Sequence, residues 1–208
     1  MTLELLIRGG PILWTTLGLG LLAAGIFLER ALHLHRARVD DSDLLHGIFN
    51  NLRRGNTDEA LSICEDTPGP VARIIATAIQ HRSAPRPTLI DDLDTAGRAE
   101  ISRMERRLSV IALVAQVAPM LGLLGTVMGL LKTVLAVRAN SPLVQMADIA
   151  DGLVPALVTT AAGLLIAIPA FAAFNVLVVK IDRLVLDMEH AASEIVQFLD
   201  TLRETKEV

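Results

Sequence analysis

Three stretches of the chain are apolar and contain no charged residue, and charges are frequent in the segments between them. They cover residues 9–28, 108–131 and 152–179, which makes them 20, 24 and 28 residues long. About 20 helical residues cross a hydrocarbon core of roughly 30 Å. Each stretch is therefore predicted to be a membrane-spanning helix.

The polar segment 29–107 is predicted to be helical, because its apolar residues recur at spacings of three and four. The first such run is Leu44, Leu45, Ile48, Phe49 and Leu52. Gly55 is expected to end this helix, and Asn56 or Thr57 to cap the next one, which stops near Pro68. A short helix from Val71 to Gln80 follows.

A long helix is predicted beyond the prolines at 85 and 87. Thr88 to Asp91 matches a capping box, and no proline follows until Pro119. One helix from Leu89 to Val137 would have about 49 residues and a length on the order of 70 Å. The tail from Lys180 keeps helical spacing and is predicted to continue the third span and to pack beside this long helix.

Charge sets the expected orientation. The chain is 52% hydrophobic with a net charge of -4, and its mean hydropathy is +0.50. Arginines gather at both membrane ends of the polar segment: Arg30, Arg36, Arg38, Arg98, Arg103, Arg106 and Arg107. The connection 139–150 has no Lys or Arg. Since positive loops stay inside, the N-terminus is expected outside and both polar segments in the cytoplasm.

The expected organisation is an all-α membrane protein with three transmembrane helices, of which the second and third extend into the cytoplasm. Its segments are a periplasmic N-terminus and first span (1–28), a cytoplasmic helical segment (29–107), the second span (108–137), a periplasmic loop (138–150), the third span (151–179) and a cytoplasmic C-terminal helix (180–208).

The residues do not favour an enzyme. Cys64 is the single cysteine, so no disulfide within the chain and no thiolate metal site is expected. The sequence has no phosphate loop, no metal cluster and no nucleophile paired with a base, and the five histidines lie in polar segments. Neither a cofactor nor a metal is predicted, and the alternation of acids with arginines indicates a solvated face rather than a nucleic-acid surface.

Small residues are concentrated in the second and third spans. In lipid, small residues let helix backbones approach closely, since packing drives association there. The residues expected to serve helix packing are Gly122, Gly125, Gly129 and Gly163.

The polar residues inside the two spans are few: Gln116, Thr126, Thr133, Thr159, Thr160 and Asn175. A single threonine in a membrane helix often bonds only to its own backbone. Asp148 and Asp151 open the third span, where each can act as a helix cap. Pro155 cannot donate to the carbonyl of residue 151, so a free acceptor and the Asp151 carboxylate coincide and could hold water or a cation.

Two long motifs carry a resemblance to a known family. Residues 118–131 read APMLGLLGTVMGLL and residues 152–170 read GLVPALVTTAAGLLIAIPA. They resemble the paired signature of the ExbB/TolQ/MotA proton-channel family, and the ExbB and TolQ branch is the most similar. Residues 9–14, GGPILW, with LER at 28–30, and GNTDEAL at 55–61 before PVAR at 70–73 are similar to that branch too.

The resemblance implies a homopentamer around a central pore in a bacterial inner membrane. The second and third helices would line the pore, and an ExbD- or TolR-like single-span partner would contribute an aspartate. Proton flow would then drive rotation that energises transport or envelope processes, with a TonB-like protein as a further candidate partner. The pore threonines of the family correspond to Thr126 and Thr160, with Thr159 as an additional hydroxyl.

The sequence departs from the branch at one position. Where the ExbB and TolQ branch has a pore glutamate, this chain has Pro155. Asp151, one turn away, is one possible substitute. Alternatively, the partner's aspartate is the only intramembrane carboxylate, or the protein no longer conducts. A non-conducting pentameric scaffold for a partner or lipid is the competing function.

Overall fold

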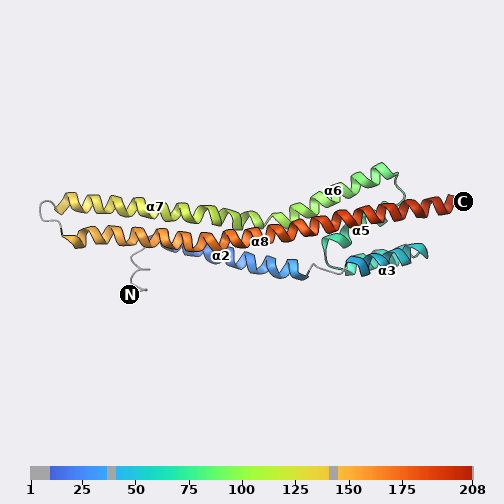
Figure 1. Ribbon diagram of the computed structural model, residues 1–208, viewed down its shortest axis with the longest axis horizontal. Coiled ribbons are helices and arrows are strands. Elements are labelled where there is room, and N and C mark those ends of the chain that lie inside the picture. Colours follow the sequence, from blue (N-terminus) through green and yellow to red (C-terminus); the bar gives the residue numbers. More distant parts are fainter. Residues whose placement is uncertain (1–9, 37–40, 141–144, 208) are drawn as a thin grey trace. The chain divides into compact units, whose positions relative to one another are not determined.

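The computed structural model describes residues 10–36, 41–140 and 145–207, and every element within them is a helix (Figure 1). The elements are α2 (Gly10–Arg36), α3 (Asp41–Arg53), α4 (Thr57–Asp66), α5 (Pro70–Gln80), α6 (Arg86–Glu105), α7 (Leu108–Asn140) and α8 (Met146–Glu207). The all-α class predicted from the sequence is confirmed for these residues.

Three helices are long and apolar enough to cross a membrane. The candidate spans are Gly10–Leu32 in α2, Leu108–Ala139 in α7 and Met146–Glu204 in α8. They contain the three charge-free stretches, apart from Gly9, which lies outside the described residues. The prediction of three spanning helices agrees with their lengths and composition.

The chain divides into two compact units. We call residues 1–29 with 107–176 the membrane unit, and residues 30–106 with 177–208 the polar unit. Helix α8 has 62 residues and contributes to both. Its single uninterrupted run agrees with the prediction that the third span continues into the tail.

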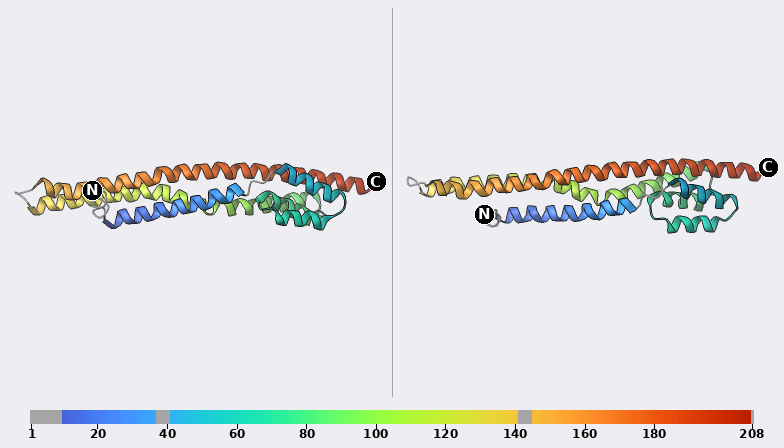
Figure 2. Two further views of the ribbon diagram at one scale, coloured as in Figure 1. Left: turned by 90° about the horizontal axis from the view of Figure 1, so that it is seen from below. Right: turned by 60° about the horizontal axis from the view of Figure 1, so that its bottom comes forward.

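In the membrane unit, α2 and α7 pack with the first part of α8 (Figure 2). Gly20 of α2 lies against Ile166 of α8, where an added Cβ would be 3.0 Å from Ile166 Cγ2. Arg107, directly before α7, forms an ion pair with Glu29 of α2. Leu13 and Thr16 are buried on the packed side of α2.

The polar unit has an apolar core of its own. It combines side chains from α3, α4, α5, α6 and the tail of α8, among them Ile48, Ile75, Leu89 and Ile195, which are all fully buried. Cys64 belongs to this core. Burial, followed by the charge of the neighbouring Glu65, raises the pKa of the Cys64 thiol to about 11, as expected for a thiol in apolar surroundings.

Ion pairs tie the helices of the polar unit together. The Glu100 carboxylate accepts from Arg73 Nη1 of α5 at 2.7 Å and from Arg103 Nη1 of α6 at 2.9 Å. Near the end of α8, Asp200 pairs with Arg86 at 3.3 Å. The tail therefore packs beside α6, as predicted.

The prediction of a single helix from Leu89 to Val137 is wrong. Helix α6 ends at Glu105, residues 106 and 107 form a turn, and α7 begins at Leu108. No proline or glycine causes this break. It falls at the boundary between the two units, so each helix is aligned by a different core: Leu89 and Leu93 are buried in one, Leu108 and Ile111 in the other.

The capping box expected at Thr88 is also wrong. Helix α6 already begins at Arg86, with Pro85 as its N-cap residue and Pro87 in the first turn. Proline fits there because the N–H groups of the first turn have no partner within the helix.

Candidate functional site

Helices α7 and α8 meet along a seam of small residues. A Cβ placed on Gly163 would lie 2.6 Å from the carbonyl oxygen of Ala118, and one on Gly129 would lie 2.6 Å from the carbonyl oxygen of Gly152. On Gly122 it would lie 3.0 Å from the Cα atom of Thr160. These pairings run in opposite directions along the two helices, so α7 and α8 are antiparallel and their backbones nearly touch.

Thr126 and Thr160 lie together beside this seam. Their Oγ1 atoms are 3.0 Å apart, one from each helix. Thr160 Oγ1 is also 2.9 Å from the carbonyl oxygen of Gly122, across the seam. Both threonines stay partly exposed. The structure therefore brings together the two threonines to which the family resemblance pointed.

The hydroxyl pair can exchange its hydrogen bonds. Each hydroxyl has one proton to donate and two lone pairs to accept with. When Thr160 donates to Gly122, Thr126 can donate either to Thr160 or to the carbonyl oxygen of Leu123, which is 2.9 Å from its own Oγ1. Rotation of one hydroxyl thus switches a bond between the helices to a bond within α7.

Thr159 takes a different position from its neighbour. Its side chain is only 4% exposed and its Oγ1 donates to the carbonyl oxygen of Ala156 in its own helix at 2.8 Å. It packs against α7 at Gly125, where an added Cβ would be 2.6 Å from Thr159 Cβ. The structure does not bring Thr159 to the hydroxyl pair.

Asp151 also lies apart from the hydroxyl pair. Nine residues separate Asp151 from Thr160, which on a helix is about 13 Å along the axis and about 180° around it. Asp151 is exposed, and α8 continues through Pro155 without interruption. Within one chain the carboxylate and the threonines therefore face different directions.

Asp148 has the capping role that the sequence offered for it. Helix α8 begins at Met146, before the predicted start at residue 151. The Asp148 Oδ2 atom accepts the backbone N–H of Gln145 at 3.1 Å, which is one half of a capping box.

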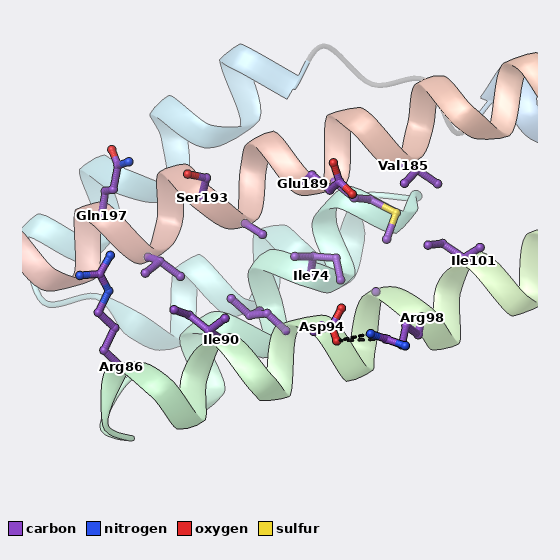
Figure 3. Close-up of a pocket in the computed structure, with 15 residues that line it drawn as sticks. Ile74, Arg86, Ile90, Asp94, Arg98, Ile101, Val185, Glu189, Ser193 and Gln197 are labelled. Carbon is purple, nitrogen blue, oxygen red and sulfur yellow. Dashed lines mark hydrogen bonds and ion pairs between the residues drawn. The ribbon is translucent and has the colours of Figure 1, made fainter.

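The polar unit contains a groove that the sequence did not predict (Figure 3). Its volume is about 380 Å³, and Arg86, Ile90 and Arg98 of α6 and Glu189 and Gln197 of α8 are among the residues that line it. Gly97 widens it, because a Cβ there would find its nearest atom, Met188 Cε, at 3.9 Å. No predicted site residue lines the groove.

The described residues define a class: a helical membrane protein whose second and third spans meet along a glycine seam with threonine hydroxyls beside it. The chain belongs to the MotA/TolQ/ExbB proton channel family, whose model matches residues 66–190. The structure and the family together make it a membrane protein of a proton-channel family.

Several curated proteins are similar to this chain. A putative ExbB homologue of Methanothermobacter thermautotrophicus is 30% identical over 181 residues, covering 86% of this chain and 64% of that protein. ExbB of Aquifex aeolicus is 36% identical over 115 residues, covering 55% and 76%. TolQ of Haemophilus influenzae is 35% identical over 108 residues, covering 51% and 46%. The relatives support the ExbB and TolQ branch.

Proposed function

We propose that this chain is the pore-forming subunit of a proton-motive-force-driven motor in a bacterial inner membrane, and not an enzyme. In this proposal the chain forms a homopentamer and works with an ExbD- or TolR-like single-span partner to energise transport or envelope processes. The N-terminus is periplasmic and the C-terminus cytoplasmic, in accordance with the arginine distribution.

The contact between Thr126 and Thr160 is the observation that carries the proposal. Polar groups inside a membrane are costly and are retained where they bond or line a pathway. Here two hydroxyls, one from each helix, meet at 3.0 Å beside the seam, and both side chains stay partly exposed. Since their hydrogen bonds can switch, the pair can orient water along which a proton moves.

The face on which the pair lies supports a role in a pore. Helix α2 contacts α8 at Ile166. Ile166 follows Thr160 by six residues, which places it about 120° away around the axis of α8. The first helix thus packs against a different side, which leaves the partly exposed threonines available to further copies or to a partner.

We further propose that the partner supplies the acid of the pathway. Pro155 occupies the position of the branch's glutamate and cannot be protonated. Asp151 points away from the threonine pair within one chain, which favours a carboxylate on the partner over Asp151 as the substitute.

Proton flux in proteoliposomes tests the proposal, with the chain reconstituted alone and with the single-span protein encoded beside it. Flux is expected only with the partner. Thr160→Val keeps the shape of the side chain and removes the hydroxyl, so flux should fall by at least about tenfold, or about 1.4 kcal/mol in barrier. Asp151→Asn should leave flux unchanged, whereas neutralising the partner's aspartate should abolish it.

The matched control is Thr15→Val in α2, where the hydroxyl donates to the carbonyl oxygen of Ile12 in the same helix. It should conduct normally. Absence of partner-dependent flux in the parent chain would refute the channel and favour the pentameric scaffold, which Pro155 keeps as the second candidate. Loss of flux in Asp151→Asn would instead make Asp151 the acid.

A further inference from the structure

Gln116 is an intramembrane polar residue that the proposed pathway does not yet use. It lies in the candidate span of α7, eight residues after the first residue of the helix, and its side chain is exposed. Its neighbours on this part of α7 include Leu113 and Met120, which are exposed apolar residues. Among the described residues, none forms a hydrogen bond with the Gln116 amide.

An amide in this position needs polar partners. The glutamine side chain offers two donors and an oxygen acceptor, and leaving such a group unbonded in hydrocarbon costs several kcal/mol. Lipid tails cannot bond to it. The amide must therefore meet water, another copy of the chain or a partner chain.

The position of Gln116 around α7 is on the same side of the seam as Thr126. At about 100° per residue, the seam glycines 122, 125 and 129 lie about 40–100° to one side of Thr126. Gln116 lies about 80° to the other side, further from the seam. Gln116 thus shares the side of the seam on which Thr126 meets Thr160, about 15 Å nearer the start of α7.

We propose that Gln116 is a positioning residue for water in the ion pathway, between the Thr126–Thr160 pair and the cytoplasm. This inference rests on the proposed function. The amide accepts from one water molecule and donates to another, which orients the chain of water molecules along which protons pass. Gln116 itself neither gains nor loses a proton.

Thiol accessibility tests whether water reaches this position. Gln116→Cys is treated, in proteoliposomes with the partner, with a charged methanethiosulfonate that does not enter lipid. Such reagents attack the thiolate, which forms only in water. The native Cys64 gives a low blank, since it is buried and its pKa is raised to about 11.

Leu165→Cys is the matched control. Gly163 of α8 lies against Ala118 of α7. Because the two helices are antiparallel, Leu165, which follows Gly163 by two residues, lies at the same membrane depth as Gln116, which precedes Ala118 by two residues. Leu165 is 76% exposed but lies about 140° around α8 from Thr160. Gln116→Cys should label at least about tenfold faster than Leu165→Cys. Equal, slow labelling of both would overturn the inference.

Flux separates a pathway role from a contact between subunits. Gln116→Leu should lower partner-dependent flux by about tenfold with the oligomer intact, and Gln116→Asn, which keeps the amide, should restore most of it. Normal flux in Gln116→Leu, or dissociation of the oligomer, would overturn the inference while the channel proposal stands. A parent chain without flux would defeat the proposed function, and labelling would still show whether Gln116 meets water.

Discussion

Helix α8 packs by different rules in the two units of this protein. In the membrane unit it meets α7 through glycines, alanines and Thr159, and large side chains such as Leu165 and Ile168 stay exposed. In the polar unit the same helix buries Met188, Ile195 and Leu199 in an apolar core. In water, burial of large apolar side chains lowers the free energy of the folded protein. In lipid this gain is missing, so close backbone approach and hydroxyl bonds hold the membrane helices together.

The largest expected effect is in the core of the polar unit. Ile195→Ala removes a fully buried side chain from α8, and such truncations cost about 2–5 kcal/mol in free energy of unfolding. Thermal denaturation of the detergent-purified chain, followed by circular dichroism, measures the loss. Leu186→Ala, in the same helix at a position 63% exposed, is the control and should change little. Equal losses in both would refute the assignment of the core.

A smaller loss is expected at the seam of the membrane unit. The added methyl group in Gly125→Ala would collide with the Thr159 side chain, and overpacking costs about 1–3 kcal/mol. The thermal midpoint of the oligomer in detergent should fall, and Thr159→Ala should restore part of it in the double variant. Gly18→Ala in α2, where no atom lies within 4 Å of the added Cβ, should lose nothing. A harmless Gly125→Ala would argue against close packing of α7 on α8.

A gain in stability, instead of a loss, is expected when a glycine of the polar unit is replaced. Gly97→Ala places its methyl group 3.9 Å from Met188 Cε, an ordinary contact. Alanine is favoured over glycine inside a helix by about 1 kcal/mol, so the polar unit should become more stable. Denaturant titration would detect the gain. A loss of stability would show that the groove is narrower than the structure has it.

The smallest effect at ordinary pH concerns Cys64. Its folded pKa of about 11 exceeds the ordinary value of 9.0, so the stability linked to this thiol is complete below pH 9 and is lost as the pH rises toward 11. The melting temperature of the parent chain should therefore fall more steeply above pH 9 than that of Cys64→Ala. Parallel curves for the two proteins would mean that the thiol is not held in an apolar core.

The spacing of apolar residues and the positions of glycine and proline were sufficient to predict most of the helices. Gly55, with a φ of +81°, separates α3 from α4 as expected, and Pro70 starts α5 at its first position, where proline is favoured. The failures are at Arg106–Arg107 and at the start of α6. At Arg106–Arg107 no single residue enforces the break, and packing in separate units decides it. At the start of α6, Pro85 takes the N-cap position and Pro87 stands in the first turn.

By itself the sequence determined the three spans, because hydropathy is a property of the local chain. It also carried the family resemblance, which named Thr126 and Thr160 as candidates for the pore. Only the tertiary structure decided which side each polar group faces: Thr160 toward Thr126, Thr159 toward Gly125, and Asp151 about half a helical circumference from the pair. The seam between α7 and α8 fixes the rotation of both helices. That rotation depends on contacts between residues 19 to 45 positions apart.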